Sequence, residues 1–301
     1  MRLIQGTADF MLDQACAAAI GKFDGIHRGH QELLARILKE KQYPAAVFTF
    51  DPPPAVFFGS GTGGRELTTR AEKRRIFEKI GVDILIEFPL NNGTAATPPA
   101  DFVREILVKR MKTALVVAGT DVTFGAGGLG DSALLARYGE KLGYRVEIID
   151  KVCADGREIS SSRIREALQA GQMEAVHALI GYPYSVTGTV VQGRQLGRTL
   201  GMPTVNLLPP ADKLLPPCGV YFSYVSWRGR HYKSISNVGY KPTVSDRRVM
   251  GVETYLYDFD EDIYGMEITV NLLKFKRPEM KFDSVQQLMA QMQRDIAEGK
   301  R

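Results

Sequence analysis

Short apolar runs alternate with amphipathic segments through the first half of the chain. The runs have the length of buried strands, and the segments between them repeat apolar residues at helical spacing. We expect strands at residues 15–20, 45–50, 82–88, 114–118 and 145–149. We expect helices after residue 30 and at residues 69–80, 98–111, 132–142 and 160–168. This order predicts a doubly wound, Rossmann-like parallel sheet, which binds ligands at the carboxyl ends of its strands.

The pattern changes near residues 181–183, after which short strands and turns follow one another. We expect strands at residues 185–191, 204–208, 220–227, 231–238, 249–259 and 266–275. Six such strands predict a small antiparallel β-barrel. A last helix should begin at Ser284, in a capping box with Gln287. Its apolar stripe should pack into the core and consists of Val285, Leu288, Met289, Met292 and Ile296. We therefore predict an α/β domain at residues 1–183 and a barrel domain at residues 184–301.

Composition and charge exclude several classes of protein. The three cysteines are far apart, which argues against a zinc site and a disulfide framework. No apolar run approaches the roughly 20 residues of a membrane-spanning helix, and the first residues lack the layout of a signal peptide. We therefore expect a cytoplasmic protein without a membrane partner. The net charge is +5, but neither half carries the dense basic stripe of a nucleic-acid binder.

The most informative stretch is residues 21–30, which lies between a predicted strand and a predicted helix. Two of the four histidines, His27 and His30, stand here three residues apart. At the N-terminus of a helix, two imidazoles and several backbone N–H groups can surround one phosphate, and Gly29 would let it approach the backbone. The alternative is an ordinary glycine-rich turn with core histidines. The pattern favours nucleotide chemistry over that alternative.

A second candidate phosphate site opens the predicted helix at residues 160–168. Ser160 and Ser161 are typical helix caps, but Arg163 and Arg165 in the first turn are unfavourable beside the helix dipole. An anionic ligand would offset that cost. With the histidines, these residues suit nucleotidyl transfer, in which a phosphate oxygen attacks the α-phosphorus of a nucleoside triphosphate and pyrophosphate leaves. The histidines would hold the α- and β-phosphates, and the arginines the pyrophosphate.

The second half contains a separate set of candidates. A glycine-rich loop leads into a strand on which Thr204 and Asn206 share one side, where their oxygens could ligate a hydrated Mg²⁺. The alternative is a turn followed by an edge strand. Glu253 lies in an otherwise apolar strand, where a carboxylate is costly to bury. It is either a general base for a hydroxyl nucleophile or a structural, salt-bridged glutamate.

Taken together, the chain resembles the bacterial bifunctional riboflavin kinase/FAD synthetase family over nearly its whole length. The resemblance rests on residues 21–30, 160–165, 200–206, 219–221, 237–243 and 277–282, and on Glu253. It implies an FMN adenylyltransferase domain of HxGH nucleotidyltransferase fold, followed by a riboflavin kinase domain of flavokinase barrel fold. The kinase would convert riboflavin and ATP to FMN with Mg²⁺, and the adenylyltransferase would convert FMN and ATP to FAD and pyrophosphate.

The resemblance also implies roles for single residues. Thr204 and Asn206 match the family's metal and phosphate ligands, and Glu253 matches its base. Further ligand-binding positions are implied at Gly21, Phe23, Asp24, Gly29, Asp121, Ser160, Ser161, Gly193, Gly197 and Pro203. The chain departs from the family pattern at Pro53, Val122 and Thr123, in the half that would hold FMN for adenylylation.

Two other functions remain as alternatives. The chain could be a riboflavin kinase only, with a regulatory nucleotide-binding domain in front. It could also be an RNA-related protein, which the pI of about 9.0 and the synthetase-like histidine motif suggest and the missing basic stripe weakens. The expected partners are therefore small molecules, without nucleic acid. The sequence leaves open whether the chain forms a homo-oligomer.

Overall fold

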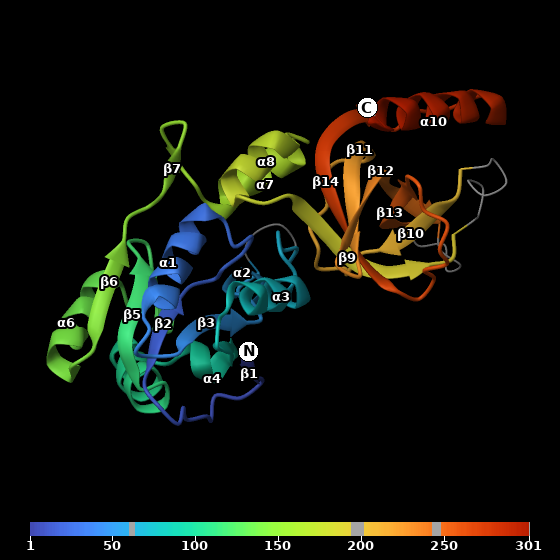
Figure 1. Cartoon of the computed structure of the whole chain (residues 1–301). Coiled ribbons are helices and arrows are strands. Elements are labelled where there is room, and N and C mark those ends of the chain that lie inside the picture. The colour runs from blue at the N-terminus through green and yellow to red at the C-terminus, as the bar shows by residue number, and fades with distance from the viewer. Residues whose placement is uncertain (60–63, 194–201, 243–247, 301) are drawn as a thin grey trace. The chain divides into compact units, whose positions relative to one another are not determined.

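The computed structural model describes residues 1–59, 64–193, 202–242 and 248–300 (Figure 1). The chain divides into two compact units, Met1–Ser160 and Ser161–Arg301, which we call the sheet unit and the barrel unit. The sequence predicts a domain boundary after residue 183 instead. The units divide earlier because helix α8 (Met173–Ile180) packs on the barrel, where Nε2 of His177 lies 2.8 Å from the carbonyl oxygen of Leu272.

Six parallel strands form the sheet among the described residues of the sheet unit. In spatial order they are β1 (Arg2–Gln5), β4 (Ile84–Pro89), β3 (Ala45–Asp51), β2 (Cys16–Ile20), β5 (Thr113–Gly119) and β6 (Arg145–Ile149). All neighbours pair in parallel, and β2 is buried along its whole length. The five predicted strands are confirmed. The edge strand β1 was not predicted.

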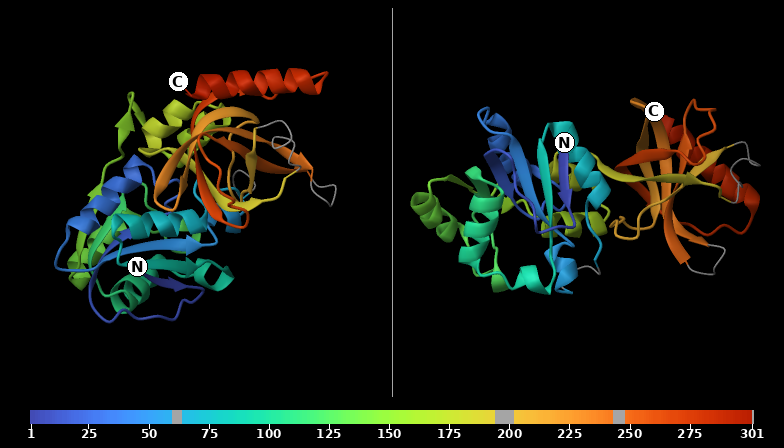
Figure 2. Two further views of the ribbon diagram at one scale, coloured as in Figure 1. Left: turned by 45° about the vertical axis from the view of Figure 1, so that its right-hand side comes forward. Right: turned by 90° about the horizontal axis from the view of Figure 1, so that it is seen from below.

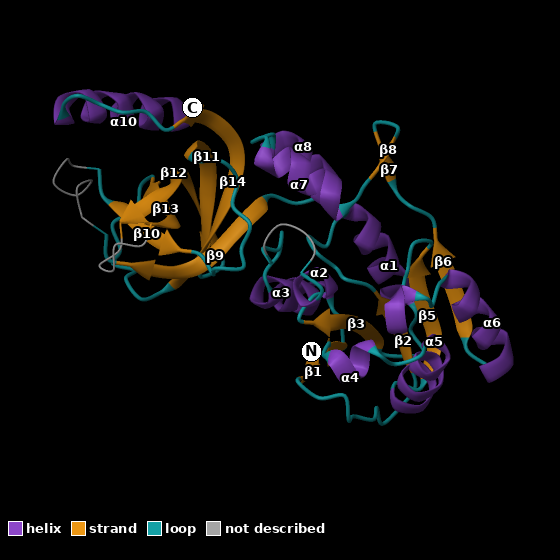
Figure 3. Cartoon of the chain, turned by 180° about the vertical axis from the view of Figure 1, so that it is seen from behind, coloured by secondary structure: helices purple, strands orange, loops and turns teal. Residues whose placement is uncertain are grey.

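Helices cover both faces of this sheet, as the doubly wound prediction requires (Figure 3). One face packs against α1 (Arg28–Lys39) and α3 (Arg70–Ile80). The other packs against α6 (Ser132–Leu142) and a helical segment made of α5 (Pro99–Asp101) and η1 (Phe102–Arg110). The remaining short elements are α2 (Pro54–Phe57), α4 (Asn92–Ala95), the turn η2 (Ala126–Gly128) and the hairpin β7 (Cys153–Ala154) and β8 (Arg157–Glu158).

The predicted helix at residues 98–111 has a different winding from the one expected. Its last nine residues, Phe102–Arg110, form a π-helix, in which each N–H bonds to the carbonyl five residues earlier. Phe102, Val103, Ile106 and Leu107 are nevertheless buried at the helical spacing of the sequence pattern. The glycine-rich stretch at residues 59–64, predicted to be a loop, lies mostly outside the described residues.

The barrel unit contains the predicted six-stranded antiparallel barrel, which is closed (Figure 2). Its strands pair in the order β10 (Thr204–Leu208), β13 (Arg248–Leu256), β12 (Arg230–Pro242), β11 (Gly219–Trp227), β14 (Glu267–Pro278) and β9 (Tyr184–Val191). The strand β9 pairs again with β10 and closes the circle. Helix α7 (Ser161–Gln169) starts at the predicted serines, and α8 is a helix that the sequence analysis missed.

Four buried hydroxyl groups line the inside of the barrel. The Oγ atom of Ser223 lies 2.8 Å from the Oγ atoms of both Ser234 and Ser236. The Oγ atom of Ser236 lies 2.8 Å from Oγ1 of Thr254. All four side chains are at most 2% exposed, so water does not supply their hydrogen bonds. They form one continuous hydroxyl chain across β11, β12 and β13, in which each buried hydroxyl has a partner.

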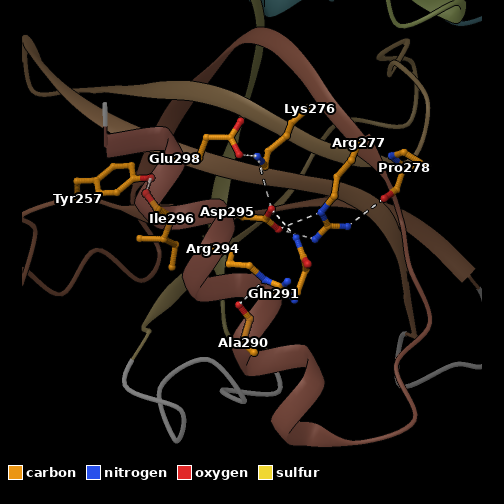
Figure 4. Close-up of polar contacts among 10 residues, drawn as sticks. All are labelled: Tyr257, Lys276, Arg277, Pro278, Ala290, Gln291, Arg294, Asp295, Ile296 and Glu298. Atoms are coloured by element: carbon orange, nitrogen blue, oxygen red, sulfur yellow. Dashed lines mark hydrogen bonds and ion pairs between the residues drawn. The ribbon is translucent and has the colours of Figure 1, made fainter.

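The last helix, α10 (Val285–Lys300), does not bury its apolar stripe, so that prediction is wrong. Val285 is 58% exposed, and the other four stripe residues are only half-buried. Polar contacts hold the helix instead (Figure 4). Asp295 is buried, and its carboxylate accepts hydrogen bonds from Arg277 at 2.5 and 3.0 Å and lies 3.7 Å from Nζ of Lys276. The hydroxyl of Tyr257 donates to the carbonyl oxygen of Ile296 at 2.6 Å.

Candidate functional site

The turn between β2 and α1 has an unusual backbone. Phe23, Gly25 and Ile26 all have positive φ, at 51°, 81° and 35°. Such angles are uncommon for residues other than glycine and persist only where the surrounding structure holds them. Here the side chains of Phe23 and Ile26 are 0% and 1% exposed and form part of the core beneath the turn. The buried side chains thus fix the path of the polar residues between and after them.

His27 and His30 are stacked on each other at the start of α1. Their ring centroids are 3.7 Å apart with 21° between the planes. His27 is the N-cap of the helix, and its Nδ1 accepts the backbone N–H of His30 at 3.4 Å. The proton of the neutral His27 ring is therefore on Nε2, which makes Nε2 a donor. The structure thus brings the two predicted histidines together at a helix N-terminus, where anions bind.

Both histidines are held in the neutral form. Burial lowers the pKa of His27 to about 4, against the opposing effect of the carboxylates of Asp24 and Asp121. Burial, the neighbouring His27 and the cation of Lys73 all place the pKa of His30 well below its usual value. Nδ1 of His30 is buried, and it is the one such side-chain atom without a hydrogen-bond partner in the described part of the chain. An orphaned polar atom of this kind is typical of functional sites.

The other predicted residues of this turn support the histidines. The ring of Phe23 packs 5.2 Å from that of His30, and since Phe23 is fully buried, only its backbone could contact a ligand. Asp24 accepts the backbone N–H of Leu67 through Oδ1 at 2.8 Å. A side chain at Gly29 would come within 3.2 Å of the His27 ring, so this glycine makes room for the imidazole. Its role in letting a phosphate approach the backbone stays a prediction.

Gly21 and Asp121 both follow strands at the carboxyl edge of the sheet. The N–H of Gly21 bonds to the carbonyl of Phe48 at 3.2 Å, and a side chain at Gly21 would meet the ring of Phe23 at 3.2 Å. Asp121 follows β5, and its Oδ2 lies 3.6 Å from Nζ of Lys151. Because Asp121 acts on the pKa of His27, its carboxylate belongs to the surroundings of the histidine pair.

The residues of the second predicted phosphate site stand in the sequence where the sheet unit ends and the barrel unit begins. Ser160 ends the sheet unit, and Ser161 begins both the barrel unit and helix α7. Arg163 and Arg165 are half-buried in the first turns of that helix. The helix start is therefore confirmed. That these arginines hold the pyrophosphate stays a prediction.

The barrel unit brings Thr204, Asn206 and Glu253 together. The hydroxyl of Thr204 donates to Oε1 of Glu253 at 2.7 Å. Asn206 is the direct cross-strand partner of Glu253 between β10 and β13. Directly paired residues point to the same face of a sheet, with Cβ atoms about 5 Å apart. A hydroxyl, an amide and a carboxylate thus share one small patch on the outside of the barrel.

The structure adds two residues to this patch that the sequence analysis did not single out. Asn237 is the partner of Glu253 on its other side, in β12. Its Nδ2 donates to Oε1 of Glu279 at 3.3 Å. A side chain at Gly239 would lie 2.1 Å from that same oxygen, so the glycine lets Glu279 approach the sheet. The signal for both was present in the sequence as the Asn-Val-Gly and Arg-Pro-Glu motifs.

The predicted glycine-rich loop before β10 is described only at its two ends. A side chain at Gly193 would come within 2.2 Å of Nδ2 of Asn206, so Gly193 lies directly against that amide. Pro203 is exposed immediately before β10, and Gly197 lies outside the described residues. No group of three or more His, Cys, Asp or Glu that could hold a metal occurs in the described part of the chain. None of its helices is long and apolar enough to cross a membrane.

Comparisons with known proteins agree with this arrangement. A family model of FAD synthetase matches residues 10–163, and one of riboflavin kinase matches residues 180–301. A bifunctional riboflavin kinase/FMN adenylyltransferase of Listeria monocytogenes is 36% identical, over 96% of this chain and 93% of its own length. The protein of that name from Escherichia coli K12 is 35% identical, over 98% of this chain and 96% of its own length.

A solved structure from Streptococcus pneumoniae, titled a macrolide-efflux protein, shares the whole fold. It has a TM-score of 0.88 and 30% identity, and the match covers 99% of this chain and 98% of that one. Both family models match, and the curated relatives exceed 30% identity over nearly the full length. The chain therefore belongs to the family of bifunctional riboflavin kinase/FMN adenylyltransferases.

Proposed function

We propose that this chain carries out both activities of its family at two separate sites. The barrel unit phosphorylates riboflavin with ATP to give FMN, and the sheet unit adenylylates FMN with a second ATP to give FAD and pyrophosphate. The observation that supports two sites is that each compact unit holds its own cluster of polar side chains. The presence of both domains favours this reading over a riboflavin kinase with a regulatory first domain.

In the kinase site, Glu253 is the general base. Its carboxylate takes the proton from the ribityl 5′-hydroxyl of riboflavin as that oxygen attacks the γ-phosphorus of ATP. Thr204 donates its hydrogen to Glu253 and so turns its lone pairs away from the carboxylate, toward the phosphates. The amide of Asn237 donates a hydrogen bond to Glu279. This bond limits the rotation of the Asn237 amide beside its cross-strand partner Glu253. The role of the protein is to align hydroxyl, base and phosphate.

The donor set of this site fits Mg²⁺. The Thr204 hydroxyl and the Asn206 amide supply neutral oxygen ligands, and Mg²⁺ prefers oxygen and usually binds through few protein ligands plus substrate phosphates. When bound, the ion would neutralise charge on the phosphates during transfer. The absence of a carboxylate-rich metal cluster in the described residues is compatible with an ion that arrives with the nucleotide.

In the adenylyltransferase site, the protein stabilises charge and forms no covalent intermediate. An oxygen of the FMN phosphate attacks the α-phosphorus of ATP, and the bond to pyrophosphate breaks. Nε2–H of His27 and the ring of His30 donate hydrogen bonds to phosphate oxygens as neutral imidazoles. Positive potential comes from the N-terminus of α1. The roles of Arg163 and Arg165 as pyrophosphate ligands, and of Ser160 and Ser161 as further donors, stay predictions from the sequence.

The experiment that tests this function follows both products in one reaction. Purified protein is given riboflavin, ATP and Mg²⁺, and FMN and FAD are separated by chromatography over time. FMN should rise first and FAD should follow, and chelation of Mg²⁺ with EDTA should stop FMN formation. FMN that never proceeds to FAD would favour the kinase-only alternative.

We also expect the enzyme in the cytoplasm, acting on small molecules without nucleic acid.

A further inference from the structure

A buried ion pair near the histidine site joins Glu66, which precedes helix α3, to Lys73 within that helix. Nζ of Lys73 is 2.6 Å from Oε1 of Glu66, and the two residues are 6% and 8% exposed. Burying two charges costs several kcal/mol per ion, and apolar residues of similar volume often stabilise a fold equally well. Folding stability alone is therefore a poor reason for this pair.

Leu67, the residue after Glu66, is hydrogen-bonded to the turn between β2 and α1 that holds His27, which we call the histidine turn. The N–H of Leu67 donates to Oδ1 of Asp24 at 2.8 Å. A side chain at Gly25 would meet Cδ1 of Leu67 at 3.0 Å, so the two segments are in close contact. A capping box between Thr69 and Glu72, both buried, then starts α3 at a defined point. Glu66 is thus adjacent in sequence to a residue that contacts the turn directly.

Helix α3 reaches the same turn through its aromatic side chain. Lys73 and Phe77 are four residues apart and lie on one face of the helix. The ring of Phe77 meets that of Phe23 edge-on at 5.6 Å, and Phe23 lies 5.2 Å from His30. Phe23 and Phe77 are fully buried, so little space remains for independent movement.

We infer that the Glu66–Lys73 ion pair is a positioning element for adenylyl transfer, which locks α3 against the histidine turn and holds a cation behind His30. The inference rests on the proposed function of the sheet unit. The charged or titratable groups that act on the histidine pair are Asp24 on the turn itself, Asp121 after β5 and Lys73 on α3. Of these, Lys73 is the cation, and it disfavours a proton on His30.

The test removes both charges together, because a single substitution would take from the remaining buried charge the partner that it has in this ion pair. The double variant Glu66→Gln/Lys73→Met is assayed for FAD formation from supplied FMN across pH, and for FMN formation from riboflavin. We expect kcat for FAD formation to fall about tenfold or more. The acid limb of its pH profile should move to higher pH, since His30 is protonated more easily without Lys73. FMN formation should stay within about twofold of the wild type, which shows that the barrel unit is intact.

A merely structural pair would lower the melting temperature and leave kcat and the acid limb of the folded enzyme unchanged, and that result would overturn the inference. If the double variant does not fold, Glu66→Asp decides. This variant keeps both charges, so the acid limb of the pH profile should stay in place. Its carboxylate side chain is shorter by one methylene, so kcat for FAD formation should fall. Wild-type kcat in Glu66→Asp would contradict the inference. Failure of the wild-type enzyme to form FAD would instead contradict the proposed function.

Discussion

The hydroxyl of Thr204 donates a hydrogen bond to Oε1 of Glu253, although the two residues are 49 positions apart in the chain. The register between β10 and β13 creates this contact, and it also sets Asn206 directly opposite Glu253. The strand register therefore holds the proposed base and the two proposed phosphate or metal ligands close together. Preorganisation of this kind means that substitutions here should change rate more than stability.

Replacing Glu253 with Gln should abolish FMN formation. The amide keeps the size of the side chain and can still accept from Thr204, but it cannot take a proton from the hydroxyl nucleophile. We expect kcat to fall roughly 10²- to 10⁴-fold, the usual contribution of a general base. The measurement is FMN produced from riboflavin and ATP. Adenylylation of supplied FMN by the same preparation is the control, and full kinase activity in Glu253→Gln would disprove the base assignment.

Replacing His30 with Ala should impair FAD formation and leave FMN formation intact, the reverse of the result expected for Glu253→Gln. Loss of one preorganised donor to a charged transition state costs about 10²- to 10³-fold in kcat. FAD formation from FMN should fall by that factor, while FMN formation from riboflavin should be unchanged. The two products report the two units in a single assay. Equal loss of both activities would argue against independent sites.

The burial of His27 should make the sheet unit less stable at acidic pH. Its pKa is about 4 in the folded chain and 6.5 when exposed, so the unfolded chain takes up a proton that the folded chain excludes. Unfolding therefore becomes easier as the pH falls from about 6.5 toward 4, and His27 alone lowers the free energy of unfolding by about 2 kcal/mol at pH 5. Denaturant unfolding at pH 8 and pH 5 measures this difference.

A matched variant isolates the effect of this one histidine. His27→Asn keeps a helix-capping side chain that can accept the N–H of His30, but it does not titrate. The loss of stability between pH 8 and pH 5 should be smaller in His27→Asn by about the same 2 kcal/mol. An identical pH dependence in both proteins would show that His27 is not the group responsible.

Helix α10 should depend on a single carboxylate. Asp295→Asn leaves the guanidinium of Arg277 and the ammonium of Lys276 without their buried anion, which costs about 3–5 kcal/mol. Glu298→Gln removes an exposed partner of the same Lys276 and should cost less than about 1 kcal/mol. Thermal unfolding of both variants compares them. Similar melting temperatures would mean that the half-buried apolar stripe holds the helix after all.

Much of this architecture follows from local patterns in the sequence. The alternating strands and helices of the sheet unit and the six barrel strands were predicted because each has a clear hydrophobic period. The helix expected at residues 69–80 is present for the same reason, since the capping box of Thr69 and Glu72 that starts it lies within four residues. The histidine pair was also recognisable, because both residues belong to one turn.

What could not be predicted depends on distant partners. Edge strand β1 buries only Ile4, so it has too little hydrophobic signal to stand out. The winding of Phe102–Arg110 is hidden because α- and π-helices bury nearly the same residues. The stripe of α10 has helical spacing, but its exposure depends on how much of the barrel lies beneath it. The pairing of Glu66 with Lys73 and of Asp295 with Arg277 required the fold itself.

The hydroxyl chain inside the barrel has a consequence for redesign of the enzyme. Ser223, Ser234, Ser236 and Thr254 hydrogen-bond only in the observed alignment of β11, β12 and β13, so a shifted strand would leave buried hydroxyls unpaired. That alignment also sets Asn237 beside Glu253 on the opposite face of the same strands. The outward-facing side chains can therefore be substituted to accept another alcohol, while the inner hydroxyls maintain the register of the strands. Replacing a single inner hydroxyl would loosen the strand register and so displace Asn237 relative to Glu253, although the hydroxyl contacts neither residue.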